Sequence, residues 1–480
     1  MMKIAQACQQ CRRAKRQCVR NNSALNAACI TCLQRRVSCS RANLDTPRRV
    51  LAPRGGLRGE CNGEDEIHLP PVLAEELVEQ YLSKIHDRPH SLFHTPSLLA
   101  DLRNGRIDRA LLLALCALGA YLTKRRALAV ALTAQSKQLV LASLEEMTVQ
   151  TIQACILIAN ICAANAEASS EALFFSTILL KIFILFCVLR CLGIAIGMVQ
   201  IKRIADVNET EPAVLRETKL RIWWTLFMAD HWYSSSLGLR RDMLLEDAPI
   251  PLPMDERVFY DLAPSQSKAE SNWKPGLWAH MVTLVQLFGP IQDLNRQSSQ
   301  CRLDQAAVDQ QTATLAEKLD QFVHALPSDM QMNEVNLETH GRQGTGGSFV
   351  ALHLGFHHYA TLLFFQYLDA GLAPTVERTQ FAARCRNHAA SYSTLLQRGR
   401  QQTQPCWETV YPTVAQMTVV SSSVLLHTLL FGVEEELANA RAALHANFAA
   451  LVELEQYWPI VTLLVYTLDS IARLLLTAAR

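Results

Sequence analysis

Acidic residues are nearly absent from the first 60 residues of this 480-residue chain. That segment contains 13 Lys and Arg but only two acidic residues, Asp45 and Glu60, so the other 420 residues carry a formal charge of −9. A segment this basic attracts polyanions such as nucleic acid or an anionic lipid surface, and the mildly acidic remainder does not. The imbalance predicts two parts with different roles.

The N-terminal sequence MMKIAQACQQC lacks an apolar run of signal-peptide length. We therefore expect a chain that stays inside the cell, where thiols are kept reduced. Its 15 cysteines are then not expected to form a disulfide framework. A regular array of reduced cysteines is more typical of a metal site, and scattered ones such as Cys116, Cys155 and Cys385 are typical of core packing.

Catalytic motifs are also missing. SSSLG, residues 234–238, lacks the first glycine of a serine nucleophile elbow, and HLGFH has Leu354 where a zinc protease has its glutamate. GRQGTGG, residues 341–347, neither follows a strand pattern nor precedes a clear helical one, so it does not indicate a nucleotide loop. We predict that the protein is not an enzyme and interpret His353 and His357 as core or surface residues.

The basic segment does contain a duplicated cysteine spacing. CQQCRRAKRQC and CITCLQRRVSC both have the form C-x2-C-x6-C, with cysteines at Cys8, Cys11, Cys18, Cys29, Cys32 and Cys39. A tetrahedral zinc ion takes four thiolates, so six thiolates can serve two ions only if two of them bridge both metals. The spacing predicts one binuclear cluster that contains two zinc ions, but it does not identify the bridging thiolates.

On these residues the segment resembles the fungal binuclear zinc cluster transcription factors, the Zn₂Cys₆ family. The resemblance implies that Cys8 and Cys29 are the bridging thiolates, that double-stranded DNA is the partner and that the protein acts in the nucleus. The segment departs from the family pattern at ALNAAC, the sequence that ends at Cys29. The family usually has a proline shortly before this cysteine, and this sequence has none there.

The sequence RRAKRQ between Cys11 and Cys18 contains good helix formers, and a helix this short depends on zinc for its stability. The resemblance implies that Lys15 contacts a CGG triplet, whose guanines offer O6 and N7 acceptors in the major groove. Three further basic residues are assigned to phosphate contacts: Arg12, Arg13 and Arg16.

We expect a zinc cluster domain over residues 1–45, a flexible linker over residues 46–70 and an all-α regulatory domain over residues 71–480. No apolar heptad follows the cysteines, so a coiled coil is not predicted and a homodimer stays an open alternative. Apolar residues recur at helical spacing from Leu73 onward, and strand-like alternation is scarce. Looser structure is expected at ETHGRQGTGGS, residues 338–348.

A second motif, ETKLRIWWTLFMADHWYSSSLG followed by EDAPIPLP, is similar to the fungal transcription factor regulatory domain, and the likeness covers about residues 72–260. Glu217 and Arg221 are spaced to pair along a helix, and we interpret the motif as scaffold. The matching residues are Glu217, Arg221, Trp223, Trp224, Asp230, Gly238 and Pro253.

The segment Leu173–Leu189 approaches the length of a membrane span, but it contains Lys181 near its centre. A buried helix is the favoured interpretation, and membrane association is not expected. A membrane tether, an insertion and a translated non-coding segment are the alternatives.

The leading hypothesis is a zinc-dependent, sequence-specific transcription regulator that reads CGG-type elements and controls a fungal metabolic gene set. Its helical domain would contact the transcription machinery or co-regulators. The rival hypotheses are a thiolate-based metal or redox-responsive regulator and a membrane-tethered regulator that uses Leu173–Leu189.

Overall fold

The computed structural model describes residues 29, 31, 32, 67–88, 90–143, 148–165, 191–200, 210–237, 241–244, 251–267, 273–369, 371–402 and 409–478. The chain divides into two compact units, Met1–Asp65 and Glu66–Arg480. In the first unit the described residues are Cys29, Thr31 and Cys32. The second unit contains all the helices named below.

The described part of the second unit is helical and contains no β-strand, which confirms the mainly α prediction. The helix at Cys191–Gln200 has no label here. The other helices of this part are labelled. In chain order these are α3 (Pro71–Lys84), α4 (Thr95–Arg103), α5 (Arg109–Leu122), α6 (Arg126–Ala142), α7 (Val149–Ala164), α10 (Ala213–Leu237), α11 (Glu256–Asp261), α12 (Leu277–Ser299), α13 (Gln305–Ala325), α14 (Glu334–Arg342), α15 (Gly346–Phe364), the 3₁₀ helix η2 (Phe365–Leu368), α16 (Val376–Gln401), α17 (Pro412–Phe431), α18 (Glu434–Glu455) and α19 (Ile460–Ala478).

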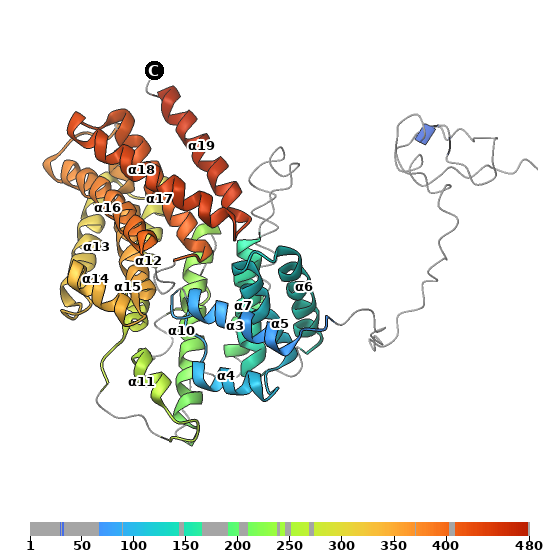
Figure 1. Cartoon of the computed structure of the whole chain (residues 1–480). Coiled ribbons are helices and arrows are strands. Elements are labelled where there is room, and N and C mark those ends of the chain that lie inside the picture. The colour runs from blue at the N-terminus through green and yellow to red at the C-terminus, as the bar shows by residue number, and fades with distance from the viewer. Residues whose placement is uncertain are drawn as a thin grey trace, which may run out of the picture. The chain divides into compact units, whose positions relative to one another are not determined.

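The helices of the second unit form two groups, with α10 between them (Figure 1). In the first group α5 packs on α3, α6 and α7; in the second, α15 packs on α12 and α16, and α17 packs on α16, α18 and α19. Helix α10 contacts α7 of the first group and α12 of the second. It therefore joins the two groups.

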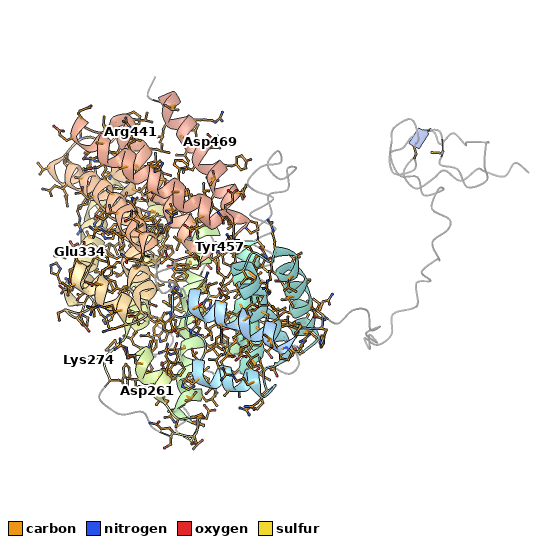
Figure 2. The ribbon with its side chains drawn as sticks, viewed as in Figure 1. Asp261, Lys274, Glu334, Arg441, Tyr457 and Asp469 are labelled. Atoms are coloured by element: carbon orange, nitrogen blue, oxygen red, sulfur yellow. The ribbon has the colours of Figure 1, made fainter. Side chains whose placement is uncertain are left out.

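Helix α10 has no exposed stripe over its central part. Every residue from Arg221 to His231 is buried, including Trp224, Phe227 and Asp230. A helix that is buried all round lies inside a large core, and its polar residues must find partners there. The outer helices instead expose charged side chains, such as Glu334, Arg441 and Asp469 (Figure 2).

Helices α3 and α5 approach each other closely at Gly119. A Cβ atom at this position would lie 2.0 Å from the carbonyl oxygen of Leu77, far inside van der Waals contact. Glycine is required here because the backbone of α3 occupies the space where a side chain would start.

The prediction of loose structure over residues 338–348 is wrong for most of that stretch. Helix α14 continues to Arg342 and α15 begins at Gly346, so the break is a short turn. Gly344 adopts a φ of 79°, a left-handed conformation that glycine adopts without steric cost. GRQGTGG therefore does lead into a helix, although it follows the helix α14 and not a strand.

Candidate functional site

The described part of the predicted zinc site is the turn from Cys29 to Cys32. The Cys32 N–H donates to the Cys29 carbonyl oxygen at 3.0 Å and to Cys29 Sγ at 3.4 Å. Both side chains are buried. An N–H that points at a sulfur favours its thiolate form, which is the form that binds zinc, so this turn fits a zinc ligand pair.

The remaining residues assigned to zinc and DNA lie outside the described residues. Within the described ranges, no group of three or more His, Cys, Asp and Glu residues is arranged to hold a metal ion. The undescribed ligands are Cys8, Cys11, Cys18 and Cys39, and the undescribed DNA contacts are Arg12, Arg13, Lys15 and Arg16.

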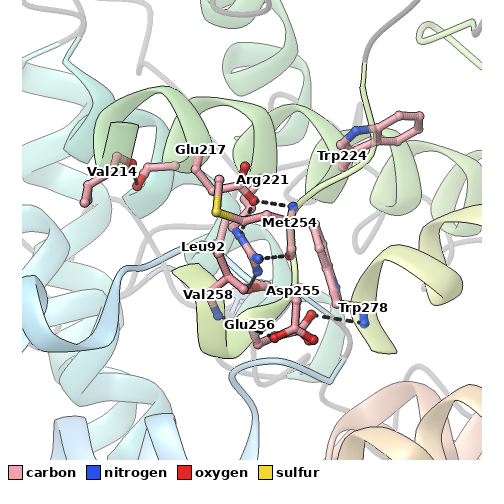
Figure 3. A network of polar contacts seen from close by, with 12 residues as sticks. Leu92, Val214, Glu217, Arg221, Trp224, Met254, Asp255, Glu256, Val258 and Trp278 are labelled. Atoms are coloured by element: carbon pink, nitrogen blue, oxygen red, sulfur yellow. Dashed lines mark hydrogen bonds and ion pairs between the residues drawn. The ribbon is translucent and has the colours of Figure 1, made fainter. Parts of the chain in front are cut away.

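The regulatory motif on α10 forms a buried polar network around Arg221 (Figure 3). The guanidinium donates from Nε to Glu217 Oε1 at 2.8 Å, from Nη1 to Ser91 Oγ at 2.5 Å and from Nη2 to the Met254 carbonyl oxygen at 2.7 Å. Its Cζ lies 4.4 Å from the Phe259 ring centroid. The predicted pairing of Glu217 with Arg221 is confirmed, and Arg221 also fixes two distant segments to α10.

Glu217 completes this arrangement, because its Oε1 also accepts the Met254 N–H at 3.0 Å. Burial raises the pKa of Glu217, and the adjacent Arg221 opposes the rise. The pKa of nearby Glu256 rises to about 7, because burial and Asp87 outweigh the attraction of Arg221. Glu256 Oε1 accepts the N–H of Trp278 at 3.1 Å, at the start of α12 (Figure 3).

Asp87 extends the network into the loop between α3 and α4. Its carboxylate accepts hydrogen bonds from Ser91 Oγ at 2.6 Å and from the Tyr260 hydroxyl. His86 Nε2 accepts the N–H groups of Leu92 and Phe93, so the ring proton is on Nδ1, 3.2 Å from Asp87 Oδ1.

Burial alone would raise the pKa of Asp87, but His86 and Arg221 hold it below its usual range. The buried charges are therefore compensated within the network. The sequence motif did not indicate Asp87, Ser91 or Tyr260, because these residues lie far from α10 in the chain.

Two further motif residues hold the chain that follows α10. Asp230 Oδ2 accepts the N–H groups of Asp242 at 2.8 Å and Met243 at 2.9 Å. Trp224 Nε1 donates to the Pro251 carbonyl oxygen at 2.9 Å. These contacts support the interpretation of the motif as scaffold; Gly238 lies outside the described residues.

The histidine pair of HLGFH faces two different environments. His353 Nε2 lies 3.0 Å from the Met330 carbonyl oxygen, whereas His357 Nδ1 lies 3.0 Å from His388 Nδ1. Burial lowers the pKa of His353 to about 4. His353 is a core residue, which is one of the two environments, core or surface, that we predicted for it.

One described helix, α17, is long and apolar enough to cross a membrane by length and composition alone. Buried residues make up 61% of its apolar window, and it packs on α16, α18 and α19. This is the pattern of a core helix. The segment Leu173–Leu189 lies outside the described residues.

A match to a known family covers more than half of the chain. Residues 78–343 match the family described as "Fungal specific transcription factor domain". The match contains helices α4 to α14, the Arg221 network and the whole motif on which the resemblance to the regulatory domain rested.

Two curated proteins are similar over most of the chain. An uncharacterized transcriptional regulatory protein of Schizosaccharomyces pombe is 23% identical over 451 residues, which is 83% of this chain and 52% of that protein. The Zn(2)-C6 fungal-type transcription factor FTF1c of Fusarium oxysporum f. sp. lycopersici is 21% identical over 431 residues, 80% of this chain and 44% of that protein. The chain thus spans about half the length of these relatives. No solved structure matches it.

Proposed function

Because this chain belongs to the family defined by the fungal specific transcription factor domain, we propose that it is a zinc-dependent, sequence-specific DNA-binding regulator of transcription. The observation that carries the proposal is the duplicated C-x2-C-x6-C frame within a strongly basic segment. The buried Cys29–Cys32 turn, whose N–H points at a sulfur, supports it. So does the similarity to the Fusarium relative, a Zn(2)-C6 fungal-type transcription factor.

In this proposal six cysteines hold two zinc ions, and Cys8 and Cys29 each contribute to both. The ions supply the cross-links that so short a segment needs to fold. The full ligand set is Cys8, Cys11, Cys18, Cys29, Cys32 and Cys39.

The basic residues between Cys11 and Cys18 divide into two roles. Lys15 donates hydrogen bonds to guanine in a CGG-type element, which gives sequence preference. Arg12, Arg13 and Arg16 contact phosphates, which gives affinity that falls with salt. The protein then acts in the nucleus, where its helical unit contacts co-regulators or the transcription machinery to control a gene set.

Selection of duplexes from a random pool by the full-length, zinc-loaded chain tests the proposal. Elemental analysis should give two zinc ions per chain, and the selected duplexes should be enriched in CGG. One triplet would indicate a monomer, and two at a fixed spacing a homodimer. Bound zinc without any selected sequence would contradict the DNA-reading role and favour a metal-responsive regulator.

Two variants separate base reading from phosphate contact. Lys15→Ala should keep both zinc ions and lose preference at one guanine, which corresponds to about 1–3 kcal/mol of discrimination. Arg12→Ala should weaken binding to all sequences alike. It should also reduce the slope of log affinity against log salt concentration by about one, which is the contribution of one phosphate contact. Lys124→Ala, in the second unit, is the control and should change neither property.

A further inference from the structure

Two cysteines of the second unit, Cys162 and Cys191, lie side by side although they come from different helices. Cys162 is in the last turn of α7, and Cys191 is in the helix Cys191–Gln200. Both thiols are free, and a hydrogen bond joins the two side chains. Both residues also pack against the same hydrophobic core. The fold therefore places two reduced sulfur atoms in direct contact.

A positive charge lies beside this pair. Lys137 comes from α6, which packs on α7 (Figure 1), and its ammonium group donates a hydrogen bond to the Cys162 sulfur. The hydrogen bond from Cys191 and the charge of Lys137 hold the pKa of Cys162 below its usual range, although burial opposes them. The bond to Cys162 and burial raise the pKa of Cys191. Cys162 is therefore the thiolate of the pair, and Cys191 keeps its proton.

Cys155 provides a contrast on the same helix. It lies two turns before Cys162 on the same face of α7, and it is only 1% exposed. Burial raises the pKa of Cys155 to about 12, so this thiol stays protonated and unreactive. Cys162 is 8% exposed and Cys191 is partly exposed, so solvent reaches the pair.

A thiolate in contact with a second thiol is the arrangement that peroxides oxidise to a disulfide. We propose that Cys162 and Cys191 form an oxidative modification site, which hydrogen peroxide converts to a disulfide bond. The bond joins α7 covalently to the helix Cys191–Gln200. The site lies in the second unit and does not depend on the proposed zinc cluster.

The reaction has two steps. The Cys162 thiolate attacks one oxygen of the peroxide, the O–O bond breaks, hydroxide leaves and Cys162 becomes a sulfenic acid. The Cys191 sulfur then attacks the Cys162 sulfur, and the S–S bond forms as the S–O bond breaks and water leaves with the Cys191 proton. The hydroxide takes up the proton that Cys162 had lost earlier. Two thiols thus give up two electrons and two protons, and one peroxide becomes two water molecules.

Peptide mapping of the full-length, zinc-loaded chain tests the proposal. The chain is treated with hydrogen peroxide, its remaining thiols are alkylated, and it is digested with trypsin without a reductant. Trypsin should release residues 191–202, which contain only Cys191, and residues 138–181, which contain Cys155 and Cys162. We expect these two peptides joined, with the loss of two hydrogens, and separated again by dithiothreitol.

Two results of this mapping would overturn the proposal. One is a peptide 191–202 that stays alkylated at a peroxide concentration that oxidises the exposed Cys301. The other is a peptide 191–202 joined to a different part of the chain.

Cys162→Ser and Cys155→Ser identify the sulfur on α7. Each variant removes one buried thiol from the same helix, so the two are matched, and circular dichroism checks that both are folded. Cys162→Ser should abolish the link, whereas Cys155→Ser should keep it. A link that persists in Cys162→Ser and is lost in Cys155→Ser would assign the bond to Cys155 and overturn the proposal.

Lys137→Gln tests whether the lysine activates the pair. The variant should form the disulfide about 10-fold more slowly near pH 7, because a smaller fraction of Cys162 is then thiolate. Lys124→Gln removes an exposed positive charge between α5 and α6 and should react at the rate of the parent chain. Equal rates in Lys137→Gln and the parent chain would contradict Cys162 as the attacking sulfur.

Discussion

The Arg221 guanidinium lies 2.8 Å from the Glu217 carboxylate one turn earlier on α10, and both side chains are fully or nearly fully buried. A buried ion pair adds little stability by comparison with a well-packed apolar pair, because both charges lose their hydration. Removing one partner destabilises the fold strongly, because the remaining charge is left without a counter-charge in the core. The pair therefore makes this part of α10 sensitive to single substitutions.

Arg221→Met should lower the free energy of unfolding by about 3–5 kcal/mol, because it leaves Glu217 unpaired and also removes the bonds to Ser91 and Met254. Urea unfolding measures the loss. Arg473→Met is the control, because Arg473 pairs with Asp469 at the same helical spacing while 78% of its side chain is exposed. It should cost about 0.5 kcal/mol or less. Equal losses in the two variants would contradict the role given to burial.

Gly119→Ala should force α3 and α5 apart, since the new Cβ would lie 2.0 Å from the Leu77 carbonyl oxygen. We expect a loss of about 1–3 kcal/mol, or more if the helices cannot separate, in a calorimetric or denaturant measurement. Gly193→Ala is the control, because no atom lies within 4 Å of its added Cβ. There the usual preference of a helix for alanine should leave stability unchanged or raise it by up to about 1 kcal/mol.

Stability should fall as the pH drops below about 6.5. Burial lowers the pKa of His353 to about 4 and the pKa values of His357 and His358 to about 3, so the folded chain keeps these rings neutral where the unfolded chain protonates them. The unfolded state then binds more protons, and acid favours it. At pH 5 each ring accounts for up to about 2 kcal/mol.

Melting temperatures between pH 7.5 and pH 5 test this dependence, with His358→Leu as the informative variant. It should melt with a smaller slope against pH than the parent chain. Glu256, whose pKa rises to about 7, contributes in the opposite direction, so the comparison of the two chains is decisive. Equal slopes for His358→Leu and the parent chain would mean that His358 is protonated in the folded state.

Chelation of zinc should abolish selective DNA binding and leave the melting of the helical unit unchanged, because the predicted ligands lie in Met1–Asp65 and the helices in Glu66–Arg480. Cys32→Ser should have the same effect without a chelator. Cys301→Ser, at an exposed cysteine of the second unit, should bind DNA normally. A fall in the main melting transition after chelation would show that zinc also stabilises the helical unit.

Local spacing was enough to predict the helices and the Glu217–Arg221 pair, because both depend on residues within a turn or two of each other. The partners Ser91 and Met254 were missed, since nothing in a local pattern connects α10 to positions 130 and 33 residues away. The turn near Gly344 was misjudged because several glycines in a row are typical of loops, whereas Gly346 and Gly347 begin α15.

The complete enclosure of α10 from Arg221 to His231 has a consequence for how this gene can vary. In a helix at a protein surface, the buried positions that do not tolerate substitution recur every third or fourth residue, which gives a periodic pattern in a saturation mutagenesis map. This segment has no outward-facing position, and its neighbours belong to both helix groups. Such a map should therefore show a continuous run of positions that do not tolerate substitution from Arg221 to His231. On either side of this run, tolerated and intolerant positions should alternate with the period of a helix.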